Sequence, residues 1–131
     1  MSKGEVICTS INEDNRLELF SKAKYLVLVD PKNMEIINKV DNPALTSENK
    51  RPTFAKECVK LNATQVIAPH GSLCFPSYFI LKKANVKIYV AQPGSLLDHS
   101  DLRVYPVNWK EILYSSYLAV KERIFETMGK K

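Results

Sequence analysis

The alternation of apolar and polar residues along the chain predicts five short strands and three helices. Apolar runs of strand length occupy residues 5–10, 24–30, 34–40, 64–69 and 86–91. Apolar residues recur at helical spacing over residues 53–62, 76–84 and 109–127. Three strands come first, and helices then alternate with strands, which is typical of a mixed sheet whose later strands are joined by parallel crossovers.

This order predicts an α/β fold of the ribonuclease H-like type. Its plan is a three-layer α/β/α arrangement around a mixed five-stranded sheet with strand order 3-2-1-4-5. The segment from residue 41 to 52 is polar and contains two prolines, so it predicts a loop. At 131 residues the chain has the size of one domain, and we expect residues 1–131 to fold as a unit.

The last helix carries two apolar stripes, and its start has a capping signal. Asn108 and Glu111 have the spacing of a capping box for a helix over residues 108–127. One stripe, predicted to face inward, consists of Trp109, Ile112, Leu113, Tyr117, Val120 and Ile124. A second stripe beside it consists of Tyr114, Leu118 and Phe125. So wide an apolar surface predicts packing on the sheet, with a partner or homodimer contact as the alternative.

Composition and charge indicate which classes of ligand and partner to expect. The net charge is +5, but the 19 basic residues are scattered among 14 acidic ones, without the patterns of a nucleic-acid-binding module. We therefore expect an attraction for small anions and no nucleic-acid partner. No apolar stretch has the length of a membrane span or of a secretory signal, which predicts a cytoplasmic protein without a membrane partner.

The three cysteines, Cys8, Cys58 and Cys74, are widely spaced and contain no Cys-x-x-Cys pair. This spacing favours neither a zinc ribbon nor a disulfide framework. Reduced thiols are the expectation, in agreement with a cytoplasmic location.

Two segments have the order and spacing of a known family. The segment FSKAKYLVLVD (residues 20–30) is similar to the pattern Phe-Gly-Arg-Ala-x-Tyr-Phe-x-x-Val-Asp, and DNPA follows the predicted hairpin. VIAPHGSLC, followed by ANVKIYV, is similar to Val-Ile-x-Gly-x-Ile-Gly-Pro followed by Ala-Gly-Ile-Lys-Val-Tyr. Over roughly residues 4–94 the chain thus resembles the dinitrogenase iron–molybdenum cofactor biosynthesis family, which includes NifX-like proteins and the C-terminal domain of NifB.

The resemblance implies a small carrier that binds an anionic iron–sulfur or iron–molybdenum-type cluster and exchanges it with cofactor-assembly proteins. The family often has His-Phe-Gly-Arg-Ala before the second strand, and its histidine is proposed to touch the cofactor. Leu19 stands at the histidine position here, while Phe20 and Ala23 match, and Ser21 and Lys22 replace the glycine and arginine. The C-terminal helix from about residue 108 lies outside the resemblance.

Three predicted loops converge where ligands of open α/β sheets bind, beyond the carboxyl ends of neighbouring strands. They are residues 8–10, 70–74 and 92–95. Gly71 would let a ligand approach the backbone, and the helix beginning at Pro76 would point its positive end there. Together with the family loop, the candidate cofactor-binding residues are Ser10, Phe20, Lys22, His70, Gly71, Ser72 and Gly94.

His70 and Cys74 are the candidate metal ligands, with Cys8 as a third, because imidazole and thiolate suit iron and other borderline metals. Each also fits a structural role. His70 can be a solvent-facing turn residue, and both cysteines can be small core residues.

Enzymatic chemistry finds little support in the sequence. A two-metal nuclease needs clustered carboxylates, but the first strand offers only Cys8, Thr9 and Ser10 at its end. No nucleophile, base and orienting group are placed together. The resemblance to the cofactor-biosynthesis family, together with the three converging loops, implies a non-catalytic protein that binds an anionic metal–sulfur cofactor or a related small anion. The alternative is a protein-interaction module of the same fold, without a small ligand, that acts through its C-terminal helix.

Overall fold

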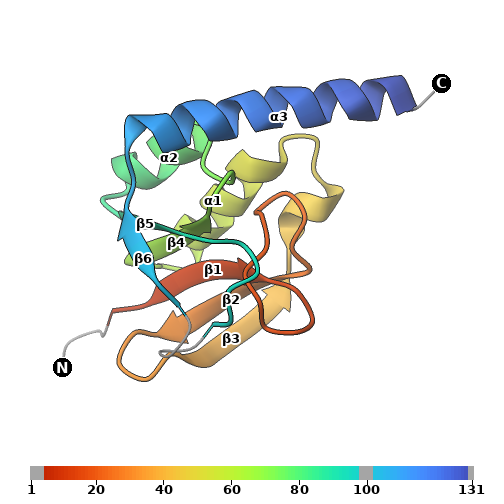
Figure 1. Ribbon diagram of the computed structural model, residues 1–131. Coiled ribbons are helices and arrows are strands. Elements are labelled where there is room, and N and C mark those ends of the chain that lie inside the picture. The colour runs from red at the N-terminus through yellow and green to blue at the C-terminus, as the bar shows by residue number, and fades with distance from the viewer. Residues whose placement is uncertain (1–4, 98–101, 130–131) are drawn as a thin grey trace.

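The computed structural model describes residues 5–97 and 102–129, which form one mixed sheet and three α-helices (Figure 1). The strands are β1 (Ile7–Ile11), β2 (Tyr25–Asp30), β3 (Glu35–Asp41), β4 (Gln65–Pro69), β5 (Lys87–Ala91) and β6 (Val104–Pro106). The helices are α1 (Lys50–Lys60), α2 (Phe75–Lys83) and α3 (Trp109–Gly129), with a short 3-10 helix, η1 (Pro43–Thr46), before α1. The eight predicted elements are confirmed, whereas β6 is too short and too exposed to give a readable pattern.

The sheet order is β3-β2-β1-β4-β5-β6. β1 pairs in parallel with β4, and β4 with β5, while the other three pairings are antiparallel. The predicted order of the first five strands agrees with the structure, but a five-stranded sheet is wrong because β6 adds a sixth strand beside β5. We call the edge where β1, β4 and β5 end the carboxyl edge, and the N-termini of α1 and α2 lie along it (Figure 1).

The two faces of the sheet are covered differently. One face packs against the helices, in a core that includes Leu26, Phe54, Leu81 and Ile112. The other face has a separate apolar cluster of strand and loop residues, such as Val27, Ile67, Leu17 and Leu97, to which no described helix contributes. The predicted three-layer arrangement is therefore wrong for the described residues, where loops replace the second helix layer.

Cys8 and Cys58 form a disulfide that ties β1 to α1. Side chains alternate between the two faces along a strand, and that of Cys8 lies on the helix-covered face of β1. Helix α1 places Cys58 opposite it. The expectation of reduced thiols is thus wrong for this pair, and the cysteines lend no support to a reducing compartment. The two cysteines are 50 residues apart and meet only in the folded chain, so their spacing in the sequence does not reveal the disulfide.

Helix α3 lies across the carboxyl edge, above the loops that end β4 and precede β2 (Figure 1). The residues of α3 that face the rest of the protein include Glu111, Ile112 and Ser115, all buried. The predicted inward stripe is wrong except for Ile112, because its other five residues are exposed. No described helix is both long enough and apolar enough to cross a membrane.

Candidate functional site

Gly71 is the centre of the contacts between the carboxyl edge and α3. It follows β4 with a φ of +96°, a conformation that favours glycine. A Cβ at this position would lie 2.9 Å from Leu118 Cδ1 on α3, so a side chain here would require Leu118 to shift in addition to adopting the unfavourable φ. The Gly71 N–H donates to Glu111 Oε2 (2.7 Å), and its carbonyl accepts from Arg51 Nε (3.1 Å) and Nη2 (2.9 Å).

The Glu111 carboxylate also binds the neighbouring histidine. Its Oε1 lies 2.5 Å from His70 Nδ1, and its Oε2 accepts from Ser115 Oγ (3.0 Å). The His70 ring stacks on Tyr114 with 4.5 Å between ring centroids. An anionic acceptor from the protein itself therefore occupies the N–H groups that a bound anion would use at this loop.

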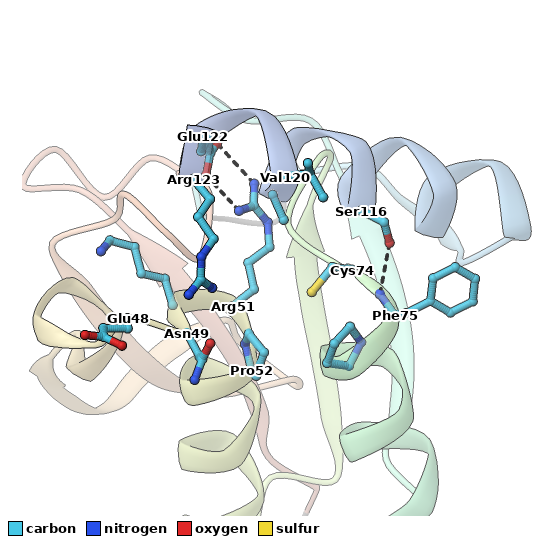
Figure 2. Close-up of a pocket in the computed structure, with 13 residues that line it drawn as sticks. Glu48, Asn49, Arg51, Pro52, Cys74, Phe75, Ser116, Val120, Glu122 and Arg123 are labelled. Carbon is cyan, nitrogen blue, oxygen red and sulfur yellow. Dashed lines mark hydrogen bonds and ion pairs between the residues drawn. The ribbon is translucent and has the colours of Figure 1, made fainter. Parts of the chain in front are cut away.

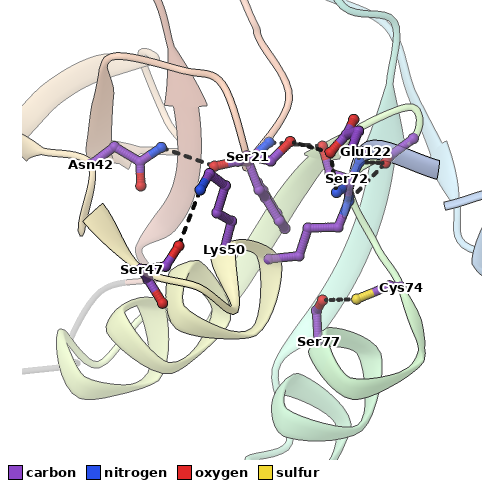
Figure 3. Close-up of polar contacts among 11 residues, drawn as sticks. Ser21, Asn42, Ser47, Lys50, Ser72, Cys74, Ser77 and Glu122 are labelled. Carbon is purple, nitrogen blue, oxygen red and sulfur yellow. Dashed lines mark hydrogen bonds and ion pairs between the residues drawn. The ribbon is translucent and has the colours of Figure 1, made fainter. Parts of the chain in front are cut away.

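Arg51 and Glu122 form a second, largely buried clamp between α1 and α3. The Arg51 side chain is only 4% exposed and the Glu122 side chain 25%. Arg51 donates from Nη1 to Glu122 Oε1 (2.8 Å) and from Nη2 to Oε2 (3.2 Å), a bidentate pair. Ser21 Oγ donates to the same carboxylate at 3.2 Å, which brings the family-like loop into the network (Figure 3).

The structure brings together one group of the predicted site residues. The Phe20 N–H donates to Ser72 Oγ (3.1 Å), which joins the loop of residues 19–23 to the loop of residues 70–74. Leu19, at the family's histidine position, lies beside Gly71, where a Cβ would be 3.2 Å from its Cδ2. Lys22 is exposed, and its charge acts on Glu122.

The other predicted residues lie apart from this group. Ser10 Oγ is buried and donates to the carbonyl of Glu18. Gly94 contacts the segment before β2, donating to Leu17 O and accepting from Arg16 Nη1 (2.7 Å). Cys8 is fully buried in its disulfide, so the prediction that it ligates a metal is wrong.

A pocket of about 370 Å³ opens between the N-termini of α1 and α2, beneath α3 (Figure 2). We call it the Arg51 pocket. Its charged lining consists of Glu48, Lys50, Arg51, Glu122 and Arg123. Its uncharged lining is mostly apolar and consists of Asn49, Pro52, Cys74, Phe75, Pro76, Ser116, Ala119 and Val120.

The electrostatics of the Arg51 pocket favour a negative ligand. Three cationic and two acidic side chains line it, and Arg123 reaches from α3 toward the start of α1 (Figure 2). Neither N-cap residue, Asn49 on α1 or Cys74 on α2, caps its helix with a side-chain hydrogen bond, although Ser116 Oγ of α3 accepts the Phe75 N–H at 3.1 Å. The positive ends of both helices therefore add to the field in the pocket.

Cys74 is the cysteine outside the disulfide and lines this pocket. Its Sγ lies 2.9 Å from Ser77 Oγ, within the first turn of α2 (Figure 3). Among the residues that the structure describes, no group of three or more His, Cys, Asp and Glu side chains could hold a metal ion. His70 and Cys74 do not belong to such a group.

Comparison with known proteins supports the fold. No protein-family model matches the chain, and no curated protein matches it. A solved structure that does match is the NMR structure of a Thermotoga protein described as a candidate NifB protein of the DUF35 family. The identity is 20% and the TM-score 0.51, over 69% of this chain and 78% of the Thermotoga chain.

At this identity the comparison shows a shared fold alone. It agrees loosely with the resemblance to a nitrogenase-related family and does not point to NifX-like proteins in particular. The ribonuclease H-like assignment stays a prediction.

The sequence pattern misses the residues that shape this region. Arg51 falls in the stretch predicted as a loop, and its partner Glu122 lies 71 positions away. The capping-box signal is half right, because Asn108 Oδ1 accepts the Glu111 N–H at 3.0 Å. The Glu111 carboxylate, however, reaches Gly71. Glu111 is buried although it is charged, and nothing in the sequence around it indicates that.

Glu122 makes stability depend on pH. Partial burial alone would raise its pKa, but hydrogen bonds and charge from Arg51, with help from Ser21 and Lys22, outweigh this and hold the pKa below the usual 4.5. A depressed pKa in the folded state gives stability that is present above pH 4.5 and lost as pH falls through the folded-state value.

We therefore expect the free energy of unfolding to fall between about pH 6 and about pH 3, and to fall less in Glu122→Gln. Urea unfolding at a series of pH values measures this. Glu35→Gln, which removes an exposed carboxylate, should keep the wild-type pH profile. Equal pH profiles for wild type and Glu122→Gln would contradict the assignment.

Proposed function

We propose that the protein is a non-catalytic binding protein for a small anion, and that the anion binds in the Arg51 pocket. The observation that carries the proposal is the pocket's lining, in which Lys50 and Arg123 accompany the Arg51–Glu122 pair at the N-termini of α1 and α2. Backbone N–H groups and cationic side chains are the groups that recognise anions in proteins.

A separate observation argues against anion binding at His70 and Gly71, at the start of the loop of residues 70–74. Glu111 already accepts from Gly71 and lies on His70, so an added anion there would meet a buried carboxylate. The Arg51 pocket is the part of the carboxyl edge that α3 leaves open. The ligand is therefore expected on the α1 side of Gly71.

An anionic metal–sulfur cluster is the narrower form of this proposal. It is supported by the family-like segments and by the fold shared with the Thermotoga protein described as a candidate NifB protein. The cluster would be cargo, held by charge and by the Cys74 thiol, and passed to cofactor-assembly proteins. The described residues offer no three-ligand protein site, so a cluster would have to bring terminal ligands of its own for the irons that Cys74 does not bind.

Calorimetric titration tests anion binding with three probes: inorganic phosphate, molybdate, and a cluster assembled from iron and sulfide without oxygen. We expect one saturable site and a loss of affinity of about tenfold or more in Lys50→Ala/Arg123→Ala. The control Lys60→Ala/Lys83→Ala makes the same change in net charge at the far ends of α1 and α2, and should bind as wild type does.

Two results would contradict the proposal. One is the absence of saturable binding for all three probes. The other is equal weakening in both double variants, which would indicate attraction to net charge instead of a pocket. Binding of the cluster alone, lost in Cys74→Ala, would favour the cluster carrier over a simple oxyanion protein.

A second candidate function is a protein-interaction module that acts through α3. The observation that favours it is the row of large apolar side chains on the outward face of this helix, each more than half exposed. Contiguous apolar surface of this kind marks interaction sites on soluble proteins.

A further inference from the structure

The outward face of α3 carries a continuous apolar row. Its members, which we call the outer stripe, are Trp109 (58% exposed), Leu113 (58%), Tyr117 (60%), Val120 (60%) and Ile124 (54%). With about 100° between successive residues, all five fall within an arc of about 80° on the helix. Tyr114 and Phe125 are also exposed and extend the row along one side.

The contacts of the opposite face fix this orientation of α3. Glu111 and Glu122 bind Gly71 and Arg51, and Ile112 is part of the helix-covered core. Turning the outer stripe toward the sheet would expose Ile112 and would leave the Gly71 N–H and the Arg51 guanidinium without their carboxylate partners, which is strongly unfavourable for buried groups. Figure 1 shows α3 along one side of the molecule, with no other described element over its outward face.

We propose that the outer stripe binds the outer stripe of a second copy of this chain, with the two α3 helices antiparallel. This deepens the second candidate function and does not depend on anion binding. Steps of four, four, three and four residues separate the members of the stripe, which is the spacing of side chains that interlock between packed helices.

The stripe is complementary to itself when it is reversed. A two-fold axis between positions 116 and 117 places Trp109 of one copy opposite Ile124 of the other, and Leu113 opposite Val120. Tyr117, next to the axis, then lies beside Tyr117 of the other copy. The two pairs away from the axis thus each combine a larger side chain with a smaller one, which favours close packing of the two helices.

The exposed area is sufficient for a stable dimer. At roughly 100–160 Å² for each exposed aliphatic or aromatic side chain, the five members of the outer stripe present about 600 Å², so two copies would bury about 1,200 Å², the lower end of the range for specific interfaces.

The dependence of binding on salt concentration distinguishes a second copy from an anionic partner. Lys110 and Lys121 lie on the same side of the outer stripe, and the antiparallel arrangement brings Lys110 of one copy near Lys121 of the other. Salt screens this repulsion, so the dimer should become tighter as NaCl concentration rises. Binding to an acidic protein or an anionic membrane would become weaker instead.

Light scattering after gel filtration, from low micromolar to sub-millimolar protein and at low and high NaCl, tests the proposal. We expect a dimer that is favoured by salt and that Leu113→Glu weakens by at least about 30-fold, the effect of losing one central contact residue. Unchanged thermal unfolding of the monomeric variant would show that it still folds. The control Ile37→Glu alters an equally exposed side chain (59%) on the edge strand β3 and should remain dimeric.

Cross-linking tests the orientation. Tyr117→Cys, close to the two-fold axis, should form a disulfide-linked dimer, whereas Leu113→Cys should not, because an antiparallel partner places Val120 opposite it. A linked Leu113→Cys dimer would overturn the antiparallel arrangement.

Three further results would overturn the proposal. They are a monomer at every concentration, a dimer that Ile37→Glu abolishes and Leu113→Glu does not, and a monomer that co-sediments with vesicles of phosphatidylcholine and phosphatidylglycerol through Leu113. The last would assign the outer stripe to an anionic membrane surface. Anion titration of the Leu113→Glu monomer separates these results from a failure of the proposed function, since Leu113 does not line the Arg51 pocket.

Discussion

Arg51→Met is expected to lower the free energy of unfolding by about 2–3 kcal/mol, because it leaves the partly buried Glu122 carboxylate without its cation and the buried Gly71 carbonyl without its donors. Glu122 would lose both guanidinium hydrogen bonds, and the Gly71 carbonyl would lose both of its donors. Methionine keeps most of the side-chain volume, so the loss measures the polar contacts and not a large cavity. Urea unfolding at neutral pH gives the value.

A second variant and a control separate the ion pair from general effects. Arg51→Met/Glu122→Met should recover part of the loss, because replacing both charges removes the unpaired carboxylate. Arg16→Met, which alters an exposed arginine with one hydrogen bond to Gly94, should change the free energy of unfolding by no more than about 0.5 kcal/mol. A loss below about 1 kcal/mol in Arg51→Met would contradict a buried clamp.

Reduction of the Cys8–Cys58 disulfide is expected to lower the free energy of unfolding by about 4 kcal/mol. The bond joins positions 50 residues apart, and a cross-link over a loop of this length removes about that much entropy from the unfolded chain. Urea unfolding of protein purified without reductant, with and without dithiothreitol, measures the difference.

The variant Cys8→Ala/Cys58→Ala supplies the control, since dithiothreitol should leave its unfolding curve unchanged. Thiol counting gives an independent check. Denatured, unreduced protein should offer one reactive thiol, that of Cys74. Three reactive thiols would contradict the disulfide.

The sheet could be predicted from the sequence because its two faces have consistent, local patterns. Alternation along β1, β2 and β4 places one set of apolar residues under the helices and the other set on the opposite face, as the structure has them. The number of strands could not be predicted, because the three exposed residues of β6 form a strand only by pairing with β5.

Helix α3 shows where the apolar pattern misleads. Its buried face contains Glu111, Ser115 and Glu122, which dock through hydrogen bonds to Gly71 and Arg51. Its outer face carries the apolar stripe. A rule that places apolar residues inward therefore gives the opposite orientation. The helix is positioned by partners 40 to 71 residues away, and no local signal marks those contacts.

The candidate site divides in the same way. The role of Gly71 could be predicted from the sequence, because a glycine directly after a buried strand indicates an unusual backbone conformation. Its φ of +96° agrees with this. His70, Ser72 and Phe20 lie near it, as the loop pattern indicates. The cations of the Arg51 pocket come from α1 and α3, and only the folded chain shows that they meet.

Backbone amide chemical shifts during titration with molybdate test the central claim, anion binding in the Arg51 pocket, most directly. The account predicts that the largest saturable shifts belong to amides in the first turns of α1 and α2, among them Lys50, Arg51 and Ser77. Amides of β3, at the far edge of the sheet, should stay in place. The absence of saturable shifts in both helix N-termini, or small shifts scattered over surface lysines, would contradict the claim.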